Sequence, residues 1–199
     1  MLNGSALNSA ALNGTAQAAS EDWTASLPVE RQTIYVLDVG DYRVRISSAQ
    51  ATMRRSGESF LQAVIPNAGE HAAAIAERAG ETMQLRSGYR YADGSLSPLE
   101  IIAEAPFQTS SQATGATNDT LTISGYGRRV SPVGVERRLA SVQTRTIGQD
   151  GRRRVRCAID LLLRPGHLAV DTDGAGFTVG TIQYFINAAS EGMEVIEDG

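Results

Sequence analysis

The sequence predicts a mainly β chain, a β-rich α+β fold with one short helix. Three observations lead to this class. Short apolar segments alternate with polar residues at the period of a half-buried strand. Clusters of Gly, Pro, Asp and Asn separate these segments at short intervals. One stretch alone carries helix signals. We expect about ten to twelve strands, in two small barrels or sandwiches or in one continuous sheet.

The chain divides into an N-terminal arm and linker (1–26), a first β-unit (27–127) and a second β-unit (128–199). The arm opens with three five-residue repeats, LNGSA, LNSAA and LNGTA, which begin at Leu2, Leu7 and Leu12. A period of five keeps the leucines on no single face of a helix or a strand. The arm is a turn-rich solenoid strip, a disordered tail, or a segment whose leucines enter pockets on a neighbouring subunit.

The first unit begins with a run of short strands and contains the expected helix, 67–79. Asn67 is expected to cap this helix, with Glu70 completing a capping box, and Gly80 to end it. The polar stretch 110–118 is expected to be a surface loop. The expected strands are 34–37, 42–53, 59–65, 82–85, 98–105 and 120–124.

The second unit follows Gly125-Tyr126-Gly127 and is expected to open with a strand at 140–146 and a turn at 148–151. An apolar strand then runs into the corner Arg164-Pro165-Gly166, and a hairpin has its tip at 171–174. A longer strand is predicted from an alternating apolar pattern, made by Phe177, Val179, Ile182, Tyr184 and Ile186. The chain closes on a strand at 193–197.

Composition excludes several classes of protein. The 199 residues are 42% hydrophobic, a globular level, and only 6% aromatic, so the core should be aliphatic. All 18 basic residues are Arg, which indicates a GC-rich genome or rigid bidentate pairing at interfaces. No apolar run approaches the roughly 18 residues that span a bilayer, and the N-terminus has no signal-peptide pattern. We expect a soluble protein, made in a reducing compartment, without a membrane span.

The sequence shows no motif for nucleotide binding, nucleophilic catalysis or metal binding. Cys157 lies in an apolar alternating run and is interpreted as a buried structural thiol. Neither His71 nor His167 has a partner at metal-ligand spacing. Asp160, Asp171 and Asp173 form a conceivable carboxylate set for hydrolysis or calcium. However, the Glu that should end a calcium loop is replaced by Ile182, so a hairpin turn is favoured. We predict no enzyme activity, cofactor or metal.

Charge is distributed in three blocks. Residues 1–127 carry a net charge of −5, residues 128–164 carry +7 from ten Arg against three acids, and residues 165–199 carry −6 with no Arg. Such blocks indicate complementary surfaces within a chain or between copies, or contact with nucleic acid. The pI of about 5.2 and the lack of aromatics among the arginines favour the first interpretation.

The pattern of turns and strands resembles a known family. Leu163-Arg164-Pro165-Gly166, Asp173-Gly174, Phe177-Thr178-Val179 and the closing Met193–Glu197 resemble the C-terminal β-units of bacteriophage tail and baseplate hub proteins, which have the tail-tube-like fold. In the first unit the step Ile65-Pro66-Asn67, a short helix and the strand Thr120–Gly127 are similar too. The likeness covers about 165 residues in layout. The chain is short for a hub, and the leucine repeat is foreign to that family.

The resemblance implies a structural component of a phage tail end, located in the virion and synthesised in the host cytoplasm. It implies two tail-tube-like units per chain, a trimer or hexamer ring, contact with other tail proteins, and a channel through which DNA passes without specific binding. The edges of the β-units and the charge blocks suit such assembly. The expected inter-subunit contacts are Leu2, Leu7, Leu12, Arg152, Arg153, Arg154, Met193 and Val195.

Two other functions stay open. The chain is alternatively a β-sandwich that binds carbohydrate or a host surface, or a tail-fibre adaptor. A sugar site would use exposed aromatic side chains, and the candidates are Trp23, Tyr89, Tyr91 and Tyr126. A carboxylate-based hydrolase would use Asp160 or Asp171.

Overall fold

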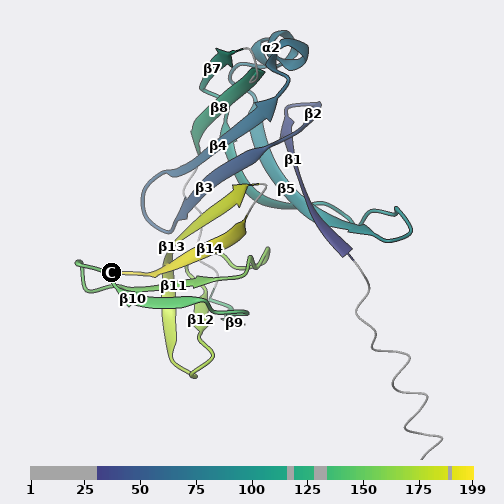
Figure 1. Cartoon of the computed structure of the whole chain (residues 1–199). Coiled ribbons are helices and arrows are strands. Elements are labelled where there is room, and N and C mark those ends of the chain that lie inside the picture. The colour runs from purple at the N-terminus through teal and green to yellow at the C-terminus, as the bar shows by residue number, and fades with distance from the viewer. Residues whose placement is uncertain (1–30, 116–118, 128–133, 188–189) are drawn as a thin grey trace, which may run out of the picture.

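The computed structural model of the chain describes residues 31–115, 119–127, 134–187 and 190–199. In these ranges the chain forms strands and one α-helix, α2 (Ala68–Ala76), which confirms the mainly β prediction. The strands make two sheets, with α2 at one end of the molecule (Figure 1). No helix of the described part is long and apolar enough to cross a membrane.

The smaller sheet is antiparallel and has the strand order β2-β1-β5-β6. Its strands are β1 (Arg31–Val39), β2 (Tyr42–Arg45), β5 (Thr82–Tyr91) and β6 (Glu100–Pro106). β5 and β6 form a hairpin that projects from the body of the molecule (Figure 1).

The wide sheet follows the order β10-β11-β14-β13-β3-β4-β8-β7, with β12 attached to β13 and β9 attached to β12. Its pairings are antiparallel except that of β12 with β9. The strands are β3 (Ser48–Arg54), β4 (Ser59–Pro66), β7 (Thr109–Thr114), β8 (Asp119–Gly127), β9 (Glu136–Arg138), β10 (Thr144–Ile147), β11 (Arg153–Cys157), β12 (Leu168–Val170), β13 (Gly176–Asn187) and β14 (Glu191–Glu197).

The wide sheet contains strands of both predicted units. β13 pairs with β3 from Thr181 opposite Arg54 to Asn187 opposite Ser48, so the two halves of the sequence meet in one continuous sheet. Both sheets are open along the described residues, and the expectation of barrels is corrected to open sheets. The boundary at residues 127 and 128 stays a prediction.

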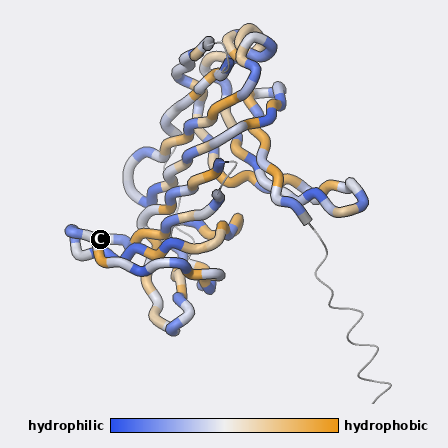
Figure 2. Tube along the Cα trace, in the orientation of Figure 1, coloured by the Kyte–Doolittle hydropathy of each residue, from blue (hydrophilic) through white to orange (hydrophobic). Residues whose placement is uncertain are grey.

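The core lies between the two sheets. β6 contacts β3, β4 and β8 of the wide sheet, and buried residues of both sheets form one cluster. Along β4, Leu61, Ala63 and Ile65 are fully buried, and the residues between them are partly exposed or face solvent. Figure 2 shows the alternation of apolar and polar positions along the strands. This period of two is the sequence signal that predicted the strands.

β13 confirms the predicted long alternating strand. It also explains why the apolar positions along this strand switch from odd to even residue numbers. Phe177 and Val179 are buried at odd positions, while Ile182, Tyr184 and Ile186 are buried at even positions. The register with β14 shifts between Val179 and Thr181. A bulge inserts one extra residue and thereby keeps the apolar side chains on the same face of the sheet.

Two glycines of β8 allow the sheets to approach each other closely. A Cβ atom on Gly125 would lie 1.8 Å from the carbonyl oxygen of Pro106, and one on Gly127 would lie 2.4 Å from that of Glu104. Gly125-Tyr126-Gly127 therefore ends a strand against β6. Only residues without a Cβ atom fit at the two contact positions.

The predicted capping box on the helix is wrong. Asn67 has left-handed backbone angles (φ 57°, ψ 53°) and makes no capping hydrogen bond with its side chain. Instead, the carboxylate of Asp119 on β8 accepts a hydrogen bond from the backbone N–H of Gly69, at 2.8 Å. An acid at a helix N-terminus also interacts favourably with the helix dipole. The helix also ends earlier than expected, at Ala76, and the chain turns at Gly80 (φ 87°).

The predicted loop at 110–118 is also wrong over most of its length. Residues 109–114 form the strand β7, which pairs with β8 from Thr109 opposite Ser124 to Thr114 opposite Asp119. All six residues are exposed. Polar composition suggested a loop, but an exposed edge strand needs no apolar side chains because the neighbouring backbone holds it.

We predict that Gly125→Ala lowers the free energy of unfolding by about 3 kcal/mol, the upper end for overpacking, because the backbone of β6 must move. Chemical denaturation measures this loss. Gly192→Ala on β14 is the matched control. Its Cβ would have ordinary van der Waals contact, with the nearest atom 3.6 Å away, and we expect a change below about 1 kcal/mol. Equal stability of the two variants would contradict the close approach.

Candidate assembly surfaces

The wide sheet ends in an exposed strand on each side. Within the described residues β7 pairs only with β8, and β10 pairs only with β11. Every residue of both strands is exposed. The outer backbone N–H and C=O groups of an edge strand are free to pair with another strand. These two edges are the strongest candidates for contact between subunits.

The two edges differ in chemistry. β7 has the sequence TSSQAT, with no charge and no Pro, and its register with β8 runs without a bulge. It therefore lacks the devices by which most proteins protect an edge. β10 carries one charged residue, Arg145, and a large apolar side chain, Ile147, which is 69% exposed.

The side chain of Arg145, which is 46% exposed, is paired with Asp171 at the tip of the β12–β13 hairpin. Its Nε lies 2.6 Å from one carboxylate oxygen of Asp171 and its Nη2 lies 2.8 Å from the other. The Asp171 side chain is only 1% exposed, and it also accepts a hydrogen bond from the backbone N–H of Thr172. The hydrogen bonds from Arg145 lower the pKa of Asp171 below its ordinary value, although burial opposes this. The pair holds β10 in place.

The basic and acidic blocks meet within the chain. β11 lies beside β14, with Arg156 opposite Glu194. The backbone N–H of Arg153 donates to the Glu197 carboxylate at 3.1 Å. The expected complementarity of the blocks is thus present inside one copy.

The sequence-predicted contact residues lie in three different settings. Arg152 and Arg154 flank the β10–β11 turn, where both form ion pairs with Asp150. The Arg153 guanidinium lies 5.2 Å from the centre of the Phe177 ring. These arginines lie beside the exposed edge β10.

Met193 and Val195 are fully buried in the chain's own core, on a strand that has neighbours on both sides. β14 is therefore not the edge that the end of the sequence suggested. Leu2, Leu7 and Leu12 lie outside the described residues. The role of all eight predicted residues between subunits stays a prediction.

The outer face of the wide sheet, opposite the core, is mostly uncharged. One cross-strand row runs from Glu194 through Gln183 and Thr52 to Phe60 and Tyr126. The next row contains Phe185, Gln50, Gln62, Ser124 and Thr109. Together the two rows cross six strands and give a broad surface that carries one charged residue, Glu194, at its β14 end. Arg54 of β3 lies next to these rows, opposite Thr181.

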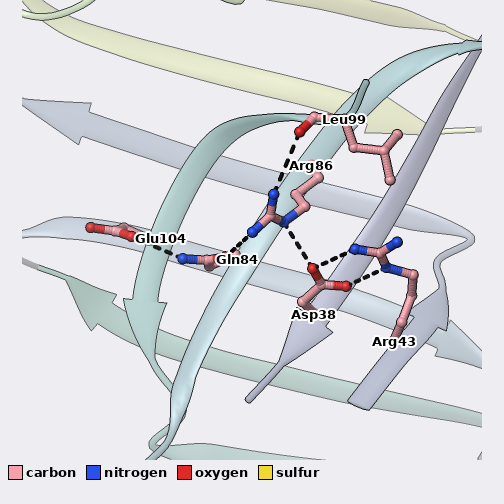
Figure 3. A network of polar contacts seen from close by, with 6 residues as sticks. All are labelled: Asp38, Arg43, Gln84, Arg86, Leu99 and Glu104. Atoms are coloured by element: carbon pink, nitrogen blue, oxygen red, sulfur yellow. Dashed lines mark hydrogen bonds and ion pairs between the residues drawn. The ribbon is translucent and has the colours of Figure 1, made fainter. Parts of the chain in front are cut away.

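A charged network lies on the outer side of the smaller sheet (Figure 3). Asp38 of β1 accepts two hydrogen bonds from Arg43 of β2, at 2.7 and 2.9 Å, and forms an ion pair with Arg86 of β5 at 2.8 Å. Gln84 accepts from Arg86 and donates to Glu104 of β6. The hydrogen bonds and charge of Arg43, with Arg86, lower the pKa of Asp38. The network ties together all four strands, and no local pattern in the sequence indicated it.

The groups proposed for catalysis have structural partners. Arg137 holds Asp160 with two hydrogen bonds, at 2.8 and 3.0 Å, and Arg145 holds Asp171. Burial raises the pKa of the Cys157 thiol to about 12, so this thiol is a poor nucleophile near neutral pH. Among the described residues no group of three or more His, Cys, Asp or Glu side chains is arranged to hold a metal ion.

The candidate sugar-binding aromatics are separated. Tyr126 is 53% exposed on the outer face and lies against Phe60, with ring centres 5.3 Å apart. Tyr89 and Tyr91 lie on β5, away from this pair in the fold, and are partly buried. Trp23 lies outside the described residues. Of the four candidates, Tyr126 with its neighbour Phe60 is the one that offers an exposed aromatic surface for the carbohydrate alternative.

Two solved structures have a similar arrangement. A tail protein from Neisseria meningitidis MC58 matches with a TM-score of 0.55 and 7% sequence identity, over 83% of this chain and 96% of that chain. The 43 kDa tail protein of prophage MuSo2 from Shewanella oneidensis matches with a TM-score of 0.54 and 7% identity, over 84% and 97%. The chain shares its fold with these tail proteins. The resemblance of fold that the sequence predicted is confirmed.

No protein-family model and no curated protein matches the sequence. At 7% identity the two tail proteins share the fold and few of the residues on it. The chemistry of β7, β10 and the outer face therefore depends on this chain's own side chains.

We predict that Asp171→Asn lowers the free energy of unfolding at pH 7 by about 2 kcal/mol, because it removes charged hydrogen bonds at a buried site. The folded pKa of Asp171 is depressed, so its contribution is present above the unfolded value near 3.8 and is lost as pH falls through the folded pKa. The unfolding free energies of the variant and the wild type, measured by chemical denaturation, should therefore converge as pH falls through the folded pKa. Asp173→Asn, exposed on the same turn, is the control and should change little. If the variant's loss of unfolding free energy were as large at low pH as at pH 7, the ionised Asp171 would not be the stabilising group.

Proposed function

We propose that the chain is a structural subunit of a bacteriophage tail end, which assembles into a ring by pairing β7 of one copy with β10 of the next. The observation that carries this proposal is a single sheet, continuous through both halves of the chain, that has a fully exposed strand at each end. The two solved structures compared above are described as tail proteins, one of them from a prophage.

The two edges suit a head-to-tail contact. Pairing β7 with β10 joins two different surfaces, which is the heterologous kind of contact that closes into a ring. β7 offers an uncharged backbone edge, and β10 adds the exposed Ile147, which β7 of a neighbour would cover. A trimer or a hexamer closes in this way, and we propose such a ring as the baseplate hub or as a ring-forming tail protein.

The outer face is proposed to line the channel. Its central rows carry Gln, Thr and Ser side chains and the aromatic residues Phe60, Tyr126 and Phe185, with no Arg from β13 through β8 in those rows. Strong DNA binding requires many cationic contacts with phosphates. A surface with hydroxyl and amide groups lets DNA pass without holding it. Location in the virion tail, contact with other tail proteins and synthesis in the host cytoplasm belong to the same proposal.

We predict that Ser110→Lys in β7 weakens self-association by about 100-fold or more. Ser110 is exposed in the single copy, but a neighbouring strand would enclose the new charge at a cost of about 3 kcal/mol. Light scattering over a concentration series measures the change. Ser56→Lys in the exposed β3–β4 turn alters the charge equally and should assemble as the wild type does.

Two results would overturn the proposal. One is a wild-type chain that stays monomeric at high concentration, and the other is a Ser110→Lys variant that assembles like the wild type. Circular dichroism of both variants checks that their folds are intact.

A further inference from the structure

A groove lies where β1 of the smaller sheet meets the end of β13 and the start of β14 in the wide sheet. It consists of two hollows, of about 560 and 280 Å³, that share Thr33, Tyr35 and Glu191 as lining residues. The larger hollow extends to Ser47 and to the β13–β14 turn, and the smaller extends to the segment after β11. The groove thus combines elements from both halves of the sequence.

The lining of the groove mixes a few aliphatic side chains with a larger number of uncharged polar ones. Ile46 and Ile186 line one hollow, and Ile159 and Leu161 line the other. Hydroxyl and amide side chains complete both, and Glu191 is the one charged residue among the described lining residues. Its carboxylate accepts a hydrogen bond from the Tyr35 hydroxyl at 2.5 Å. Such a groove suits an uncharged chain with medium-sized apolar side chains, and it does not suit nucleic acid.

The N-terminal segment of the chain has this chemistry. Residues 2–16 contain no charged residue, and the only large side chains are Leu2, Leu7 and Leu12. Burying a Leu side chain contributes about 1.5–3 kcal/mol, whereas exposed leucines in a segment of small residues contribute nothing to stability.

The position of the groove favours this segment as its occupant. The described chain begins at Arg31, and Gln32 and Thr33 line the larger hollow. Residues 17–30 separate the repeats from that point and span at most about 50 Å. A folded body of this size has a radius of gyration of about 16 Å, so the segment reaches an adjacent copy. Because Gln32 and Thr33 themselves line the larger hollow, residues 2–16 would enter the groove of their own copy only if residues 17–30 folded back on themselves.

We infer that residues 2–16 of one copy occupy the groove at Thr33, Tyr35 and Glu191 of a second copy. This inference rests on the proposed ring, because it requires adjacent copies. It adds a second contact to the pairing of sheet edges, and it assigns the leucine repeat a specific receiving surface. If each copy places its segment in the groove of the next copy, the rotation that closes the ring of edge contacts also closes the ring of exchanged segments.

Cysteine pairing tests the inference in the full-length chain. Three single variants, Leu2→Cys, Leu7→Cys and Leu12→Cys, are each mixed with Ser47→Cys in a glutathione redox buffer. Ser47 is exposed and lines the larger hollow, and a disulfide forms only when the Cα atoms come within about 7 Å. Ser56→Cys, an exposed serine beyond the other end of β3, is the matched control. The native Cys157 is buried and does not compete.

We expect a covalent heterodimer from at least one arm variant with Ser47→Cys, at a yield ten or more times that with Ser56→Cys. Light scattering of the same mixtures reports assembly separately. Assembly of normal size without a preferred heterodimer would overturn the inference and leave the ring standing, whereas absence of assembly would overturn both. A chain that carries both cysteines and closes only within itself would also overturn the inference, in favour of docking in its own groove.

Discussion

The pairing of β13 with β3 is the constraint on which the rest of the structure depends. It joins residues that are more than a hundred positions apart in the sequence. Small and large side chains face each other along it, with Ala51 opposite Tyr184 and Ala49 opposite Ile186. All four are buried, so the two strands fill one layer of the core together. Because of this pairing, both halves of the chain lie in one sheet, whose main path ends in β7 and β10 and whose side branch through β12 ends in β9.

The consequences for function follow from the same pairing. It places β7 and β10 at opposite ends of one sheet, and it sets the polar residues of β3, β4, β8 and β13 on a single outer face. It also brings Ser48 opposite Asn187, where β3 begins and β13 ends beside the groove. The edges, the outer face and the groove are thus three results of one long-range contact. Two separate barrels would have provided none of them.

Arginine has a structural use throughout the chain. Arg43 with Asp38, Arg137 with Asp160, and Arg145 with Asp171 each form two parallel hydrogen bonds. The planar guanidinium is suited to such fork-like pairing, which Lys cannot provide. Within one copy, these pairs connect two neighbouring strands, hold β9 to the segment after β11, and hold β10 to the tip of a hairpin. The bidentate role expected at subunit interfaces is therefore seen inside the subunit.

Local patterns in the sequence predicted local structure well. The alternation from Phe177 to Ile186, the hairpin tip at 171–174 and most strands of the first half were found in this way. The pairing of β3 with β13 was not, since no local pattern records which distant strand lies alongside. β7 was missed because its side chains are all polar. Met193 and Val195 were assigned to an edge because the chain ends there, although a chain end is no guide to a strand's neighbours.

Backbone hydrogen exchange of the assembled protein, compared with the unassembled Ser110→Lys variant, tests the central claim most directly. Amides that gain a strand partner exchange more slowly. The account predicts that amides of both β7 and β10 become protected on assembly, while those of β2, an edge of the smaller sheet, exchange at an unchanged rate. Assembled particles in which β7 and β10 exchange as fast as in the single copy would contradict it.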